Sequence, residues 1–392
     1  MSMREFSITI YLLSFKLLFN LFKHFFSLKN KITFVVSFYE NPMFIYEKMK
    51  HINVDVECVF LCHPRCCKNF TKTGELVYLF ESKNIWHTLK GIYHLATSRV
   101  VMIDNYYGFL SVIEFKKEVE CIQIWHAVGA VKKFGIEDPS NNLRSPQVID
   151  RFKKVYRKFD KIVVGSEFMS SIFQKVFLAS EDKFLKIGIP RTDFFFQTQK
   201  HEKIKQTLFQ TNPALANKKV ILYAPTFRKD ETSNFKLQLD INKMHKTLKD
   251  EYALILKLHP SVDGFRSLSD KYSGFVFDYS DYKQVNDLLI ITDILITDYS
   301  SIPMEFAFLR RKMIFYAYDL HQYKKTNGIW EDYGKNMPGP ISKTTDELIT
   351  EILNPHINLH KIDAFKEKWT AYCEGDASEK FVEYLLQNLI SH

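Results

Sequence analysis

Several short motifs place polar or cationic side chains directly after runs of apolar residues. In chain order these side chains are His126, Lys132 and Lys133 after "CIQI", Thr226 and Arg228 after "KVILY", His259 after "YALILKL", Asp298, Ser300 and Ser301 after "DILIT", and Tyr318 and Asp319 after "MIFYA". A neutral imidazole can remove a proton from a hydroxyl group near pH 7. Arginine, lysine and hydroxyl side chains bind phosphate oxygens. The set therefore predicts proton transfer at a phosphate-containing substrate.

His126 is the best candidate for a catalytic base. It stands between Trp125 and a turn that contains Gly129, and a histidine at the end of a buried strand is a costly choice for packing alone. The other side chains also have ordinary structural explanations. Ser300 or Ser301 could simply cap a helix, and His259 could be a turn histidine. Lys132 and Lys133 could belong to a solvated face, and Arg228 could pair with a surface carboxylate.

The segment "TDYSSIPMEF" (297–306) predicts a strand, a turn and a helix that begins near Pro303. Free N–H groups at the helix start, with the hydroxyls of Ser300 and Ser301, would bind an anion. Glu305, one turn later, would accept hydrogen bonds from ribose hydroxyls. The chain contains no GxGxxG, GxxxxGK[ST] or DxD motif. These features predict a nucleotide diphosphate site made by side chains and a helix terminus, without an obligatory metal cage.

From residue 31 onward, short apolar runs alternate with helix-length segments. The candidate strands are 32–39, 56–62, 76–80, 99–104, 121–125, 161–166, 184–188, 219–225, 252–258, 274–278, 293–298 and 313–318. Continuous apolar runs are typical of parallel sheets covered by helices on both faces. The pattern predicts an α/β chain of two doubly wound, Rossmann-like domains. The polar stretch 197–218 divides residues 31–205 from 206–392, and the last helices are able to pack back on the first domain.

Residues 6–28, "FSITIYLLSFKLLFNLFKHFFSL", are long and apolar enough to cross a membrane. Polar side chains recur there at three- and four-residue steps, which places them on one helical face; they are Lys16, Asn20, Lys23, His24 and Ser27. A charged stripe through a span is costly. We therefore expect residues 1–30 to form an amphipathic helix in the membrane interface, with Lys16, Lys23, Lys29 and Lys31 toward anionic head groups. An amphipathic helix packed on its own domain is the alternative.

Composition limits the classes of partner. The 392 residues include 54 Lys and Arg against 45 Asp and Glu, a formal net charge of +9. This excess suits an anionic membrane surface or a phosphorylated substrate, and no homeodomain, zinc-finger or RNP signature points to nucleic acid. Cys58, Cys62, Cys66 and Cys67 lie near His63, but their spacing fits no standard zinc pattern. We expect no metal site and reduced, structural thiols in the cytosol.

Four motifs in this order, "WHAVGAVKKFG", "YAPTFR", "KLHP" and "ITDYSSIPMEF", resemble the CDP-glycerol glycerophosphotransferases of wall teichoic acid synthesis. The resemblance runs from roughly residue 30 to the C-terminus. It implies a GT-B-type fold of two Rossmann-like domains facing across a cleft, with the donor bound mainly by the C-terminal one. It also implies a peripheral protein on the cytoplasmic face of the cell membrane. No cofactor is required, and the resemblance allows assistance by Mg2+ and partnership with other teichoic acid enzymes.

The resemblance also implies roles for individual residues. His126 corresponds to the general base, Arg228 and His259 would hold the donor diphosphate, and Glu305 would bind the ribose. Ser300 and Ser301 would bind phosphate oxygens, and the predicted substrate site is completed by Asp298, Thr226, Lys132 and Lys133. The first motif, with Ala127 and Phe134, is similar to that of the primases rather than to the WHGTP form of the polymerases. Val128 departs from the primase pattern, which has Asn at this position.

The resulting hypothesis is transfer of glycerol phosphate from CDP-glycerol to an undecaprenyl-diphosphate-linked disaccharide. The acceptor hydroxyl would belong to its N-acetylmannosamine, and CMP would leave. A poly(glycerol phosphate) or ribitol-phosphate polymerase of the same family is the nearest alternative. A UDP-sugar glycosyltransferase of GT-B type and a membrane-bound scaffold with a degenerate cleft are the more distant alternatives.

Overall fold

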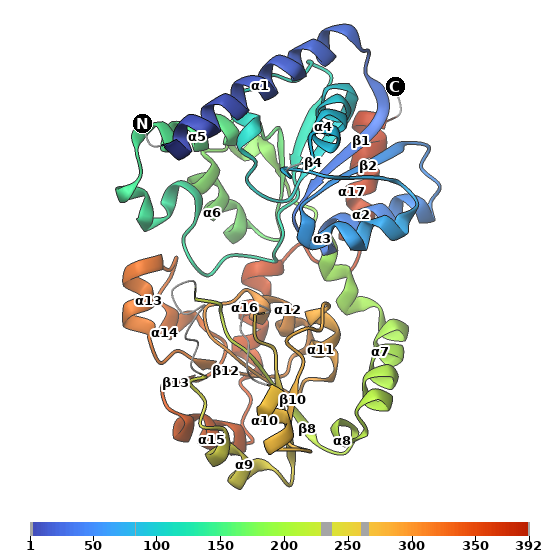
Figure 1. The fold of residues 1–392 in the computed structure, drawn as a ribbon. Coiled ribbons are helices and arrows are strands. Elements are labelled where there is room, and N and C mark those ends of the chain that lie inside the picture. The colour runs from blue at the N-terminus through green and yellow to red at the C-terminus, as the bar shows by residue number, and fades with distance from the viewer. Residues whose placement is uncertain (1–2, 83, 229–236, 260–265, 391–392) are drawn as a thin grey trace. The chain divides into compact units, whose positions relative to one another are not determined.

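The computed structural model describes residues 3–82, 84–228, 237–259 and 266–390 (Figure 1). The chain divides into two compact units, each with its own parallel sheet. Unit 1 contains the residues up to Val128, Phe134–Phe194 and those from Thr370 onward, and unit 2 contains Gly129–Lys133 and Phe195–Trp369. The main division thus falls at 194–195, whereas the predicted division is at 205–206. The last helix, α17 (Ala377–Leu385), belongs to unit 1.

Unit 1 has a seven-stranded sheet in the order β3-β2-β1-β4-β5-β6-β7, and every paired strand is parallel to its neighbour. Its strands are β1 Lys29–Val36, β2 Glu57–Cys62, β3 Leu76–Leu79, β4 Ser98–Ile103, β5 Glu120–Gln123, β6 Lys161–Val163 and β7 Phe184–Leu185. Its other helices are α1 Met3–Phe25, α2 Glu40–His51, α3 Pro64–Phe70, α4 Ile85–Thr97, α5 Pro146–Tyr156 and α6 Glu167–Phe177. The strand order reverses between β1 and β4, where such folds bind ligands.

Unit 2 repeats this plan with six parallel strands in the order β10-β9-β8-β11-β12-β13. The strands are β8 Lys219–Ala224, β9 Tyr252–Leu256, β10 Val276–Asp278, β11 Ile294–Thr297, β12 Lys312–Tyr316 and β13 Ile341–Ser342. The helices are α7 Thr198–Thr211, α8 Pro213–Ala216, α9 Ile241–Leu248, α10 Arg266–Lys271, α11 Val285–Ile291, α12 Ile302–Phe306, α13 Leu320–Asn327, α14 Tyr333–Asn336, α15 Thr345–Leu353 and α16 Leu359–Thr370. The order reverses between β8 and β11.

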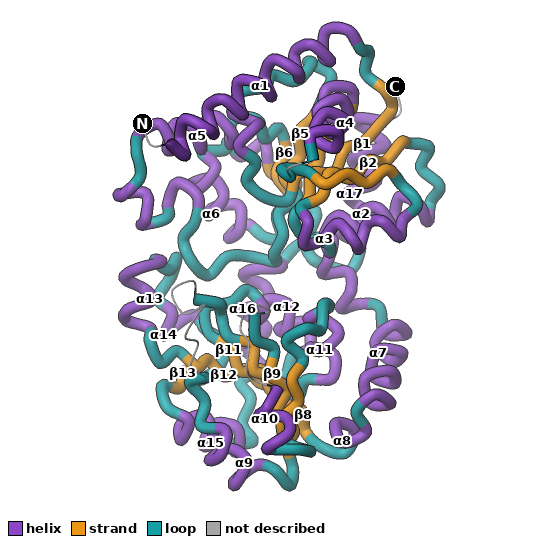
Figure 2. Tube along the Cα trace, in the orientation of Figure 1, coloured by secondary structure: helices purple, strands orange, loops and turns teal. Residues whose placement is uncertain are grey.

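The predicted α/β architecture is confirmed, and each of the twelve predicted strands is present. Within each unit, helices lie on both sides of the strands (Figure 2). The central strands are therefore buried on both faces, which explains their unbroken apolar sequences. The strands end earlier than predicted, so residues 37–39, 124–125, 225 and 257–258 form loops at the carboxyl edge of a sheet. The additional strand β13 has only two residues, too few for a sequence pattern.

Helix α1 packs against unit 1 with one face and exposes apolar side chains on the other. Phe15 and Phe19 are each 1% exposed, and the ring of Phe15 stacks on that of Phe109 at 4.9 Å. Phe22 contacts Tyr93 of α4, beside which α1 runs (Figure 1). The exposed apolar side chains of α1 are Met3, Phe6, Ile10, Leu13, Leu17, Leu21 and Phe25. By length and composition, residues 5–25 could also cross a membrane.

The prediction that Lys31 faces anionic head groups is wrong. Lys31 lies on β1 inside the sheet and is fully buried. Its ammonium group lies 3.2 Å from Nδ1 of His94 and donates to the Thr97 hydroxyl at 2.6 Å. Burial lowers the pKa of Lys31 to about 8 and that of His94 to about 3. Lys23 also points inward, donating to the carbonyl of Glu114 at 2.7 Å. Lys16 and Lys29 remain exposed.

The buried charge of Lys31 predicts a pH-dependent cost to stability. Its folded pKa is lower than that of an ordinary lysine, so the unfolded chain binds the proton more tightly. The buried charge therefore lowers the free energy of unfolding by its full amount below pH 8. This loss disappears as the pH rises toward about 10.4, the pKa of a free lysine. We expect Lys31→Met to raise the free energy of unfolding by roughly 2 kcal/mol at pH 7. This advantage should shrink between pH 8 and 10, as measured by urea unfolding.

The exposed Lys175 on α6 provides the matched control for this experiment. Lys175→Met removes the same group from a solvated position and should leave no pH-dependent difference from the wild type. A Lys31→Met protein that is less stable than the wild type, with a difference independent of pH, would show that the hydrogen bonds of Lys31 outweigh the cost of its burial.

Candidate functional site

The predicted site residues lie at the carboxyl edges of the two sheets, near the points where the strand order reverses. His126 belongs to unit 1, whereas the remaining predicted residues belong to unit 2. The latter are Lys132, Lys133, Thr226, Arg228, His259, Asp298, Ser300, Ser301 and Glu305. Loops at such edges bind the ligands of doubly wound proteins. The two edges are described separately.

Asp104 holds together the ends of three strands in unit 1. One carboxylate oxygen accepts hydrogen bonds from the backbone N–H groups of Ser37 (2.8 Å) and Phe38 (2.7 Å), and the other accepts from the Tyr107 hydroxyl (2.9 Å). The backbone carbonyl of Asp104 lies 2.8 Å from Nδ1 of His126. Burial raises the pKa of this carboxyl group to about 7, while the three donors act in the opposite direction. Asp104 thus positions both the loop after β1 and the imidazole after β5.

The contact with Asp104 determines which ring nitrogen of His126 is available. A carbonyl only accepts hydrogen bonds, so Nδ1 carries the proton and Nε2 keeps its lone pair. Burial lowers the pKa of His126 to about 4; the Asp104 carbonyl opposes this shift, and the positive charges of Arg191 and Arg65 add to it. The imidazole is therefore neutral at pH 7. A neutral imidazole with a free Nε2 has the form that a general base requires.

The turn before His126 is strained and is held on both sides. Trp125 has a φ angle of 55°, a left-handed conformation that is rare for a bulky residue. Its N–H donates to the side chain of Gln123 (2.9 Å), and its carbonyl accepts from Asn41 (3.0 Å). Arg191 donates to the carbonyl of His126 at 3.0 Å. Backbone strain of this kind concentrates at functional sites, and here it fixes the direction of the imidazole.

Asp298 has the equivalent structural role in unit 2. It is 1% exposed and accepts hydrogen bonds from the N–H groups of Thr226 (2.7 Å) and Tyr299 (2.7 Å) and from the guanidinium of Arg228 (3.1 Å). Burial raises its pKa, and the charge of Arg228 acts against that shift. Asp298 thus joins the loops after β8 and β11, and its direct contact with a substrate stays a prediction. The Thr226 hydroxyl is buried and has no hydrogen-bond partner among the described residues.

Arg228 is held by two carboxylates. Its Nε and Nη2 donate to the two oxygens of Asp319 at 2.8 and 3.0 Å, in addition to the bond with Asp298. The Tyr299 hydroxyl also donates to Asp319 (2.9 Å). The ion-pair alternative for Arg228 is therefore realised, with a guanidinium that is only 12% exposed. To bind a phosphate, Arg228 must use its remaining N–H groups or exchange Asp319 for the ligand.

The segment after β11 has the predicted strand–turn–helix form. Helix α12 begins at Ile302 with Pro303 in its first turn. The Ser300 hydroxyl accepts from the N–H of Ile302 at 3.2 Å, which is the predicted structural alternative, whereas Ser301 makes no side-chain cap. Glu305 is 2% exposed and accepts from the amide of Asn286 at 3.2 Å. Binding of phosphate by the serines and of ribose by Glu305 stays a prediction.

His259 stacks on Phe227, with ring centroids 4.1 Å apart and planes inclined by 26°. The residue is exposed overall. Partial desolvation of its ring, together with the charge of Lys257, lowers the pKa of His259. The stack joins the loop after β8 to the loop after β9. The following Pro260 of the "KLHP" motif lies outside the described residues.

The segment Gly129–Lys133 leaves unit 1 just after the His126 turn and pairs with unit 2. Lys132 forms an antiparallel bridge with Ile329, and the N–H of Lys133 donates to the carbonyl of Gly328 (3.2 Å). The ammonium of Lys133 lies 5.3 Å from the ring centre of Trp330. A Cβ on Gly129 would lie 2.5 Å from atoms of Met304 and Trp369, so only glycine fits there. The lysines are therefore fixed by their backbone, and their contact with a substrate stays a prediction.

Two residues beside His126 were not predicted from the sequence. The ring of Phe38 stacks on the imidazole with centroids 4.3 Å apart and planes inclined by 9°. The guanidinium of Arg65 lies 4.4 Å from the centre of the same Phe38 ring. These residues follow β1 and β2, whereas His126 follows β5, so only the strand order brings them together.

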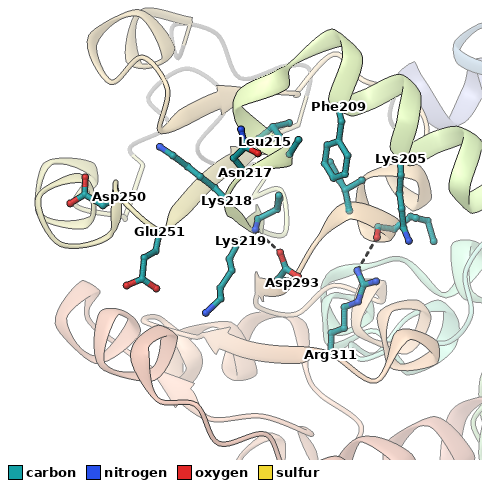
Figure 3. A pocket seen from close by; sticks show the side chains of 14 residues that line it. Lys205, Phe209, Leu215, Asn217, Lys218, Lys219, Asp250, Glu251, Asp293 and Arg311 are labelled. Carbon is teal, nitrogen blue, oxygen red and sulfur yellow. Dashed lines mark hydrogen bonds between the residues drawn. The ribbon is translucent and has the colours of Figure 1, made fainter.

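A pocket of about 650 Å3 in unit 2 lies at the opposite edge of its sheet (Figure 3). Lys219, the first residue of β8, and Asp293, just before β11, line it, so it opens at the amino ends of the strands. Its charged groups are partly engaged within the protein: Asp293 accepts from the N–H of Val220, and Arg311 donates to the carbonyl of Ile290. This pocket is separate from the predicted site residues.

The cysteines form no disulfide, and five of the six are buried. Cys58 and Cys62 lie on β2, as the sequence predicts. Burial raises the pKa of Cys58 to about 12, so its thiol stays protonated. In the described part of the chain, no three His, Cys, Asp or Glu side chains are grouped as metal ligands would be.

Comparisons with known proteins agree with these observations. The family model for CDP-glycerol:poly(glycerophosphate) glycerophosphotransferases matches residues 17–387. The chain is 37% identical over 367 residues to the teichoic acid glycerol-phosphate primase of Bacillus subtilis, covering 93% of each chain. It is 35% identical to the teichoic acid poly(ribitol-phosphate) polymerase of Bacillus spizizenii over 309 residues, 49% of that protein.

Solved structures show the same fold. The wall teichoic acid polymerase TagF, in its H444N variant, superposes with a TM-score of 0.78 at 22% identity, covering all of this chain and 99% of that one. A UDP-GlcNAc 2-epimerase from Neisseria meningitidis gives a TM-score of 0.58 at 16% identity, with 91% of this chain covered. From the family match along nearly its whole length, the chain belongs to the CDP-glycerol glycerophosphotransferase family, the transferases of teichoic acid synthesis.

Proposed function

We propose that this transferase is a primase, which moves glycerol phosphate from CDP-glycerol to the N-acetylmannosamine of an undecaprenyl-diphosphate-linked disaccharide. The supporting observation is the match to the B. subtilis primase, which extends over 93% of both chains. The chain spans only 49% of the poly(ribitol-phosphate) polymerase of B. spizizenii and 65% of the ribitol-phosphate polymerase TarL of Staphylococcus aureus. Both polymerases are also less similar to this chain, at 35% and 31% identity against 37% for the primase.

In the proposed reaction, His126 acts as the general base. The acceptor hydroxyl gives its proton to Nε2 of His126, and its oxygen forms a bond to the β-phosphorus of CDP-glycerol. The bond between that phosphorus and the bridging oxygen breaks, and CMP leaves with the electron pair. The hydrogen bond from Nδ1–H to Asp104 supports this role, because it orients the ring and stabilises the imidazolium that forms. The proposed reaction uses no resident cofactor.

The donor is assigned to the carboxyl edge of unit 2. Phosphoryl transfer depends mainly on positioning and on offsetting negative charge. Arg228 and His259 would neutralise the diphosphate, with the hydroxyls of Ser300 and Ser301 as further donors. The support is their common location on the loops after β8, β9 and β11. In this proposal, Asp319 and Asp298 hold Arg228 ready for the donor.

The choice of acceptor tests the proposed function. We expect release of CMP from CDP-glycerol with the disaccharide lipid as acceptor, and at least ten times less with the same lipid already carrying glycerol phosphate. Replacing the donor by CDP-ribitol or UDP-N-acetylglucosamine should abolish turnover. Continued addition to the primed lipid would instead identify a polymerase, and turnover of the UDP-sugar would identify a glycosyltransferase.

Substitution of His126 tests the role of the base. His126→Ala should lower the rate of CMP release about 100-fold or more, the scale of general acid–base catalysis. The exposed His51 at the end of α2 is the matched control, and His51→Ala should keep the wild-type rate. Because the pKa of His126 is lowered to about 4, activity should be lost only as the pH falls toward 4. Near-normal turnover by His126→Ala would remove this residue from the mechanism.

We also propose that α1 binds the cytoplasmic face of the cell membrane as a peripheral, interfacial helix. Its outer surface presents apolar side chains, such as Leu13 (60% exposed) and Leu17 (73% exposed), which water solvates poorly. Lys16 lies between them and is also exposed, as suits contact with anionic head groups. The net charge of +9 adds a general attraction to such a surface.

Two leucines on α1 provide a test of membrane binding. The double variant Leu13→Ser/Leu17→Ser should reduce binding to anionic liposomes about 10-fold or more in a sedimentation assay, because each buried leucine contributes roughly 1.5–3 kcal/mol. The control is Leu353→Ser/Ile357→Ser in unit 2, whose side chains are 50% and 40% exposed. Equal binding by both double variants would show that α1 is not the membrane contact.

A further inference from the structure

Arg65 and His126 both contact the ring of Phe38 at the carboxyl edge of the unit 1 sheet. The imidazole lies 4.3 Å from the Phe38 ring centre, and the guanidinium carbon lies 4.4 Å from it. Both groups therefore contact the same aromatic ring. Phe38 itself is anchored by the bond from its N–H to Asp104. Arg65 is thereby held at a defined distance from the base.

The guanidinium of Arg65 is immobilised but keeps donors available. Its Nε donates to the carbonyl of Ser37 at 2.8 Å, and its central carbon lies 4.4 Å from the centre of the Phe38 ring. No carboxylate among the described residues lies within ion-pair distance of it, and the side chain is exposed. Its terminal amino groups therefore face solvent as a preorganised fork. Arginine forks of this kind bind phosphate in a bidentate manner, at a low entropic cost.

Two carboxylates follow β1 and β4 at this edge, and both have partners other than Arg65. Asp104 is buried, and its oxygens are bonded to Ser37, Phe38 and Tyr107. Glu40, the first residue of α2, lies 3.9 Å from the guanidinium of Arg191. A fixed cation without a carboxylate partner is suited to an anionic ligand.

The corresponding loops of unit 2 contain a similar pair. Phe227 follows the first strand of that sheet, as Phe38 does in unit 1, and it stacks on His259. "HP" follows the second strand of each sheet, at His63 and at His259. In both units, therefore, an aromatic ring after the first strand contacts a nitrogen-bearing side chain from the segment after the second strand.

We propose that Arg65 is a phosphate-binding residue of unit 1, which holds a phosphate group of the substrate that reacts at His126. The proposal rests on the function proposed above. That reaction brings two such groups: the diphosphate of the lipid-linked acceptor and the phosphates of the nucleotide donor. Both present the same chemistry, an oxyanion that accepts two parallel hydrogen bonds. Arg65 contacts the same aromatic ring as the base and, within the described part of the chain, no hydrogen bond joins it to the imidazole, so it would orient the substrate rather than react with it.

The test measures binding to the full chain by titration calorimetry, so it does not depend on turnover. The probes are geranyl diphosphate, which represents the prenyl diphosphate of the acceptor, and CDP, which represents the donor. Arg65→Gln should weaken binding of one of them about 10-fold or more, and Arg65→Lys should lie between it and the wild type because lysine offers a single point of contact. Lys68→Gln, which removes an exposed charge from the same helix, should change affinity less than 2-fold.

The two probes separate the sources of the phosphate. Weaker binding of geranyl diphosphate alone assigns Arg65 to the acceptor, and weaker binding of CDP alone assigns it to the donor. Either result supports the proposal even if the chain fails to transfer glycerol phosphate. Equal affinities of Arg65→Gln and Lys68→Gln for both probes, or the absence of binding by the wild type, would overturn it.

Discussion

The arrangement of unit 1 depends on the hydrogen bonds of one buried residue, Asp104. Its carboxylate fixes the loop after β1 through Ser37 and Phe38, and its carbonyl fixes the ring of His126 after β5. These loops come from strands that are separated in sequence and are brought together by the order of the parallel sheet. Without these hydrogen bonds, the imidazole would have no fixed tautomer and the backbone of Phe38 beside it would lose its anchor.

Unit 2 uses the same device for a different purpose. Asp298 also follows the fourth strand of its sheet, and it also accepts a backbone N–H from the loop after the first strand. Its remaining oxygen holds Arg228, whereas the remaining oxygen of Asp104 accepts from the Tyr107 hydroxyl. One unit therefore presents a neutral imidazole, and the other presents a cation supported by carboxylates. These are the two kinds of group that phosphoryl transfer to a hydroxyl requires.

The fold could be predicted from the sequence because buried parallel strands have continuous apolar sequences, as β1 and β8 do. The position of His126 at a strand end could be predicted for the same reason. Arg65 could not, because its neighbours Phe38 and His126 come from other strands, and their contact depends on strand order. Lys31 was assigned to the wrong surface because its two partners, His94 and Thr97, lie on a distant helix. Contacts between distant segments leave no local pattern.

The central claim is that burial keeps His126 neutral while the carbonyl of Asp104 holds its proton on Nδ1. Two-bond 1H–15N correlation spectra of the histidine-labelled protein, recorded across a pH titration, test this claim most directly. The pattern for His126, identified by its loss in His126→Gln, should show a protonated Nδ1 and an unprotonated Nε2 at pH 7, and it should persist until the pH approaches about 4. A proton on Nε2 at pH 7, or titration near the usual pKa of about 6.5, would contradict the account.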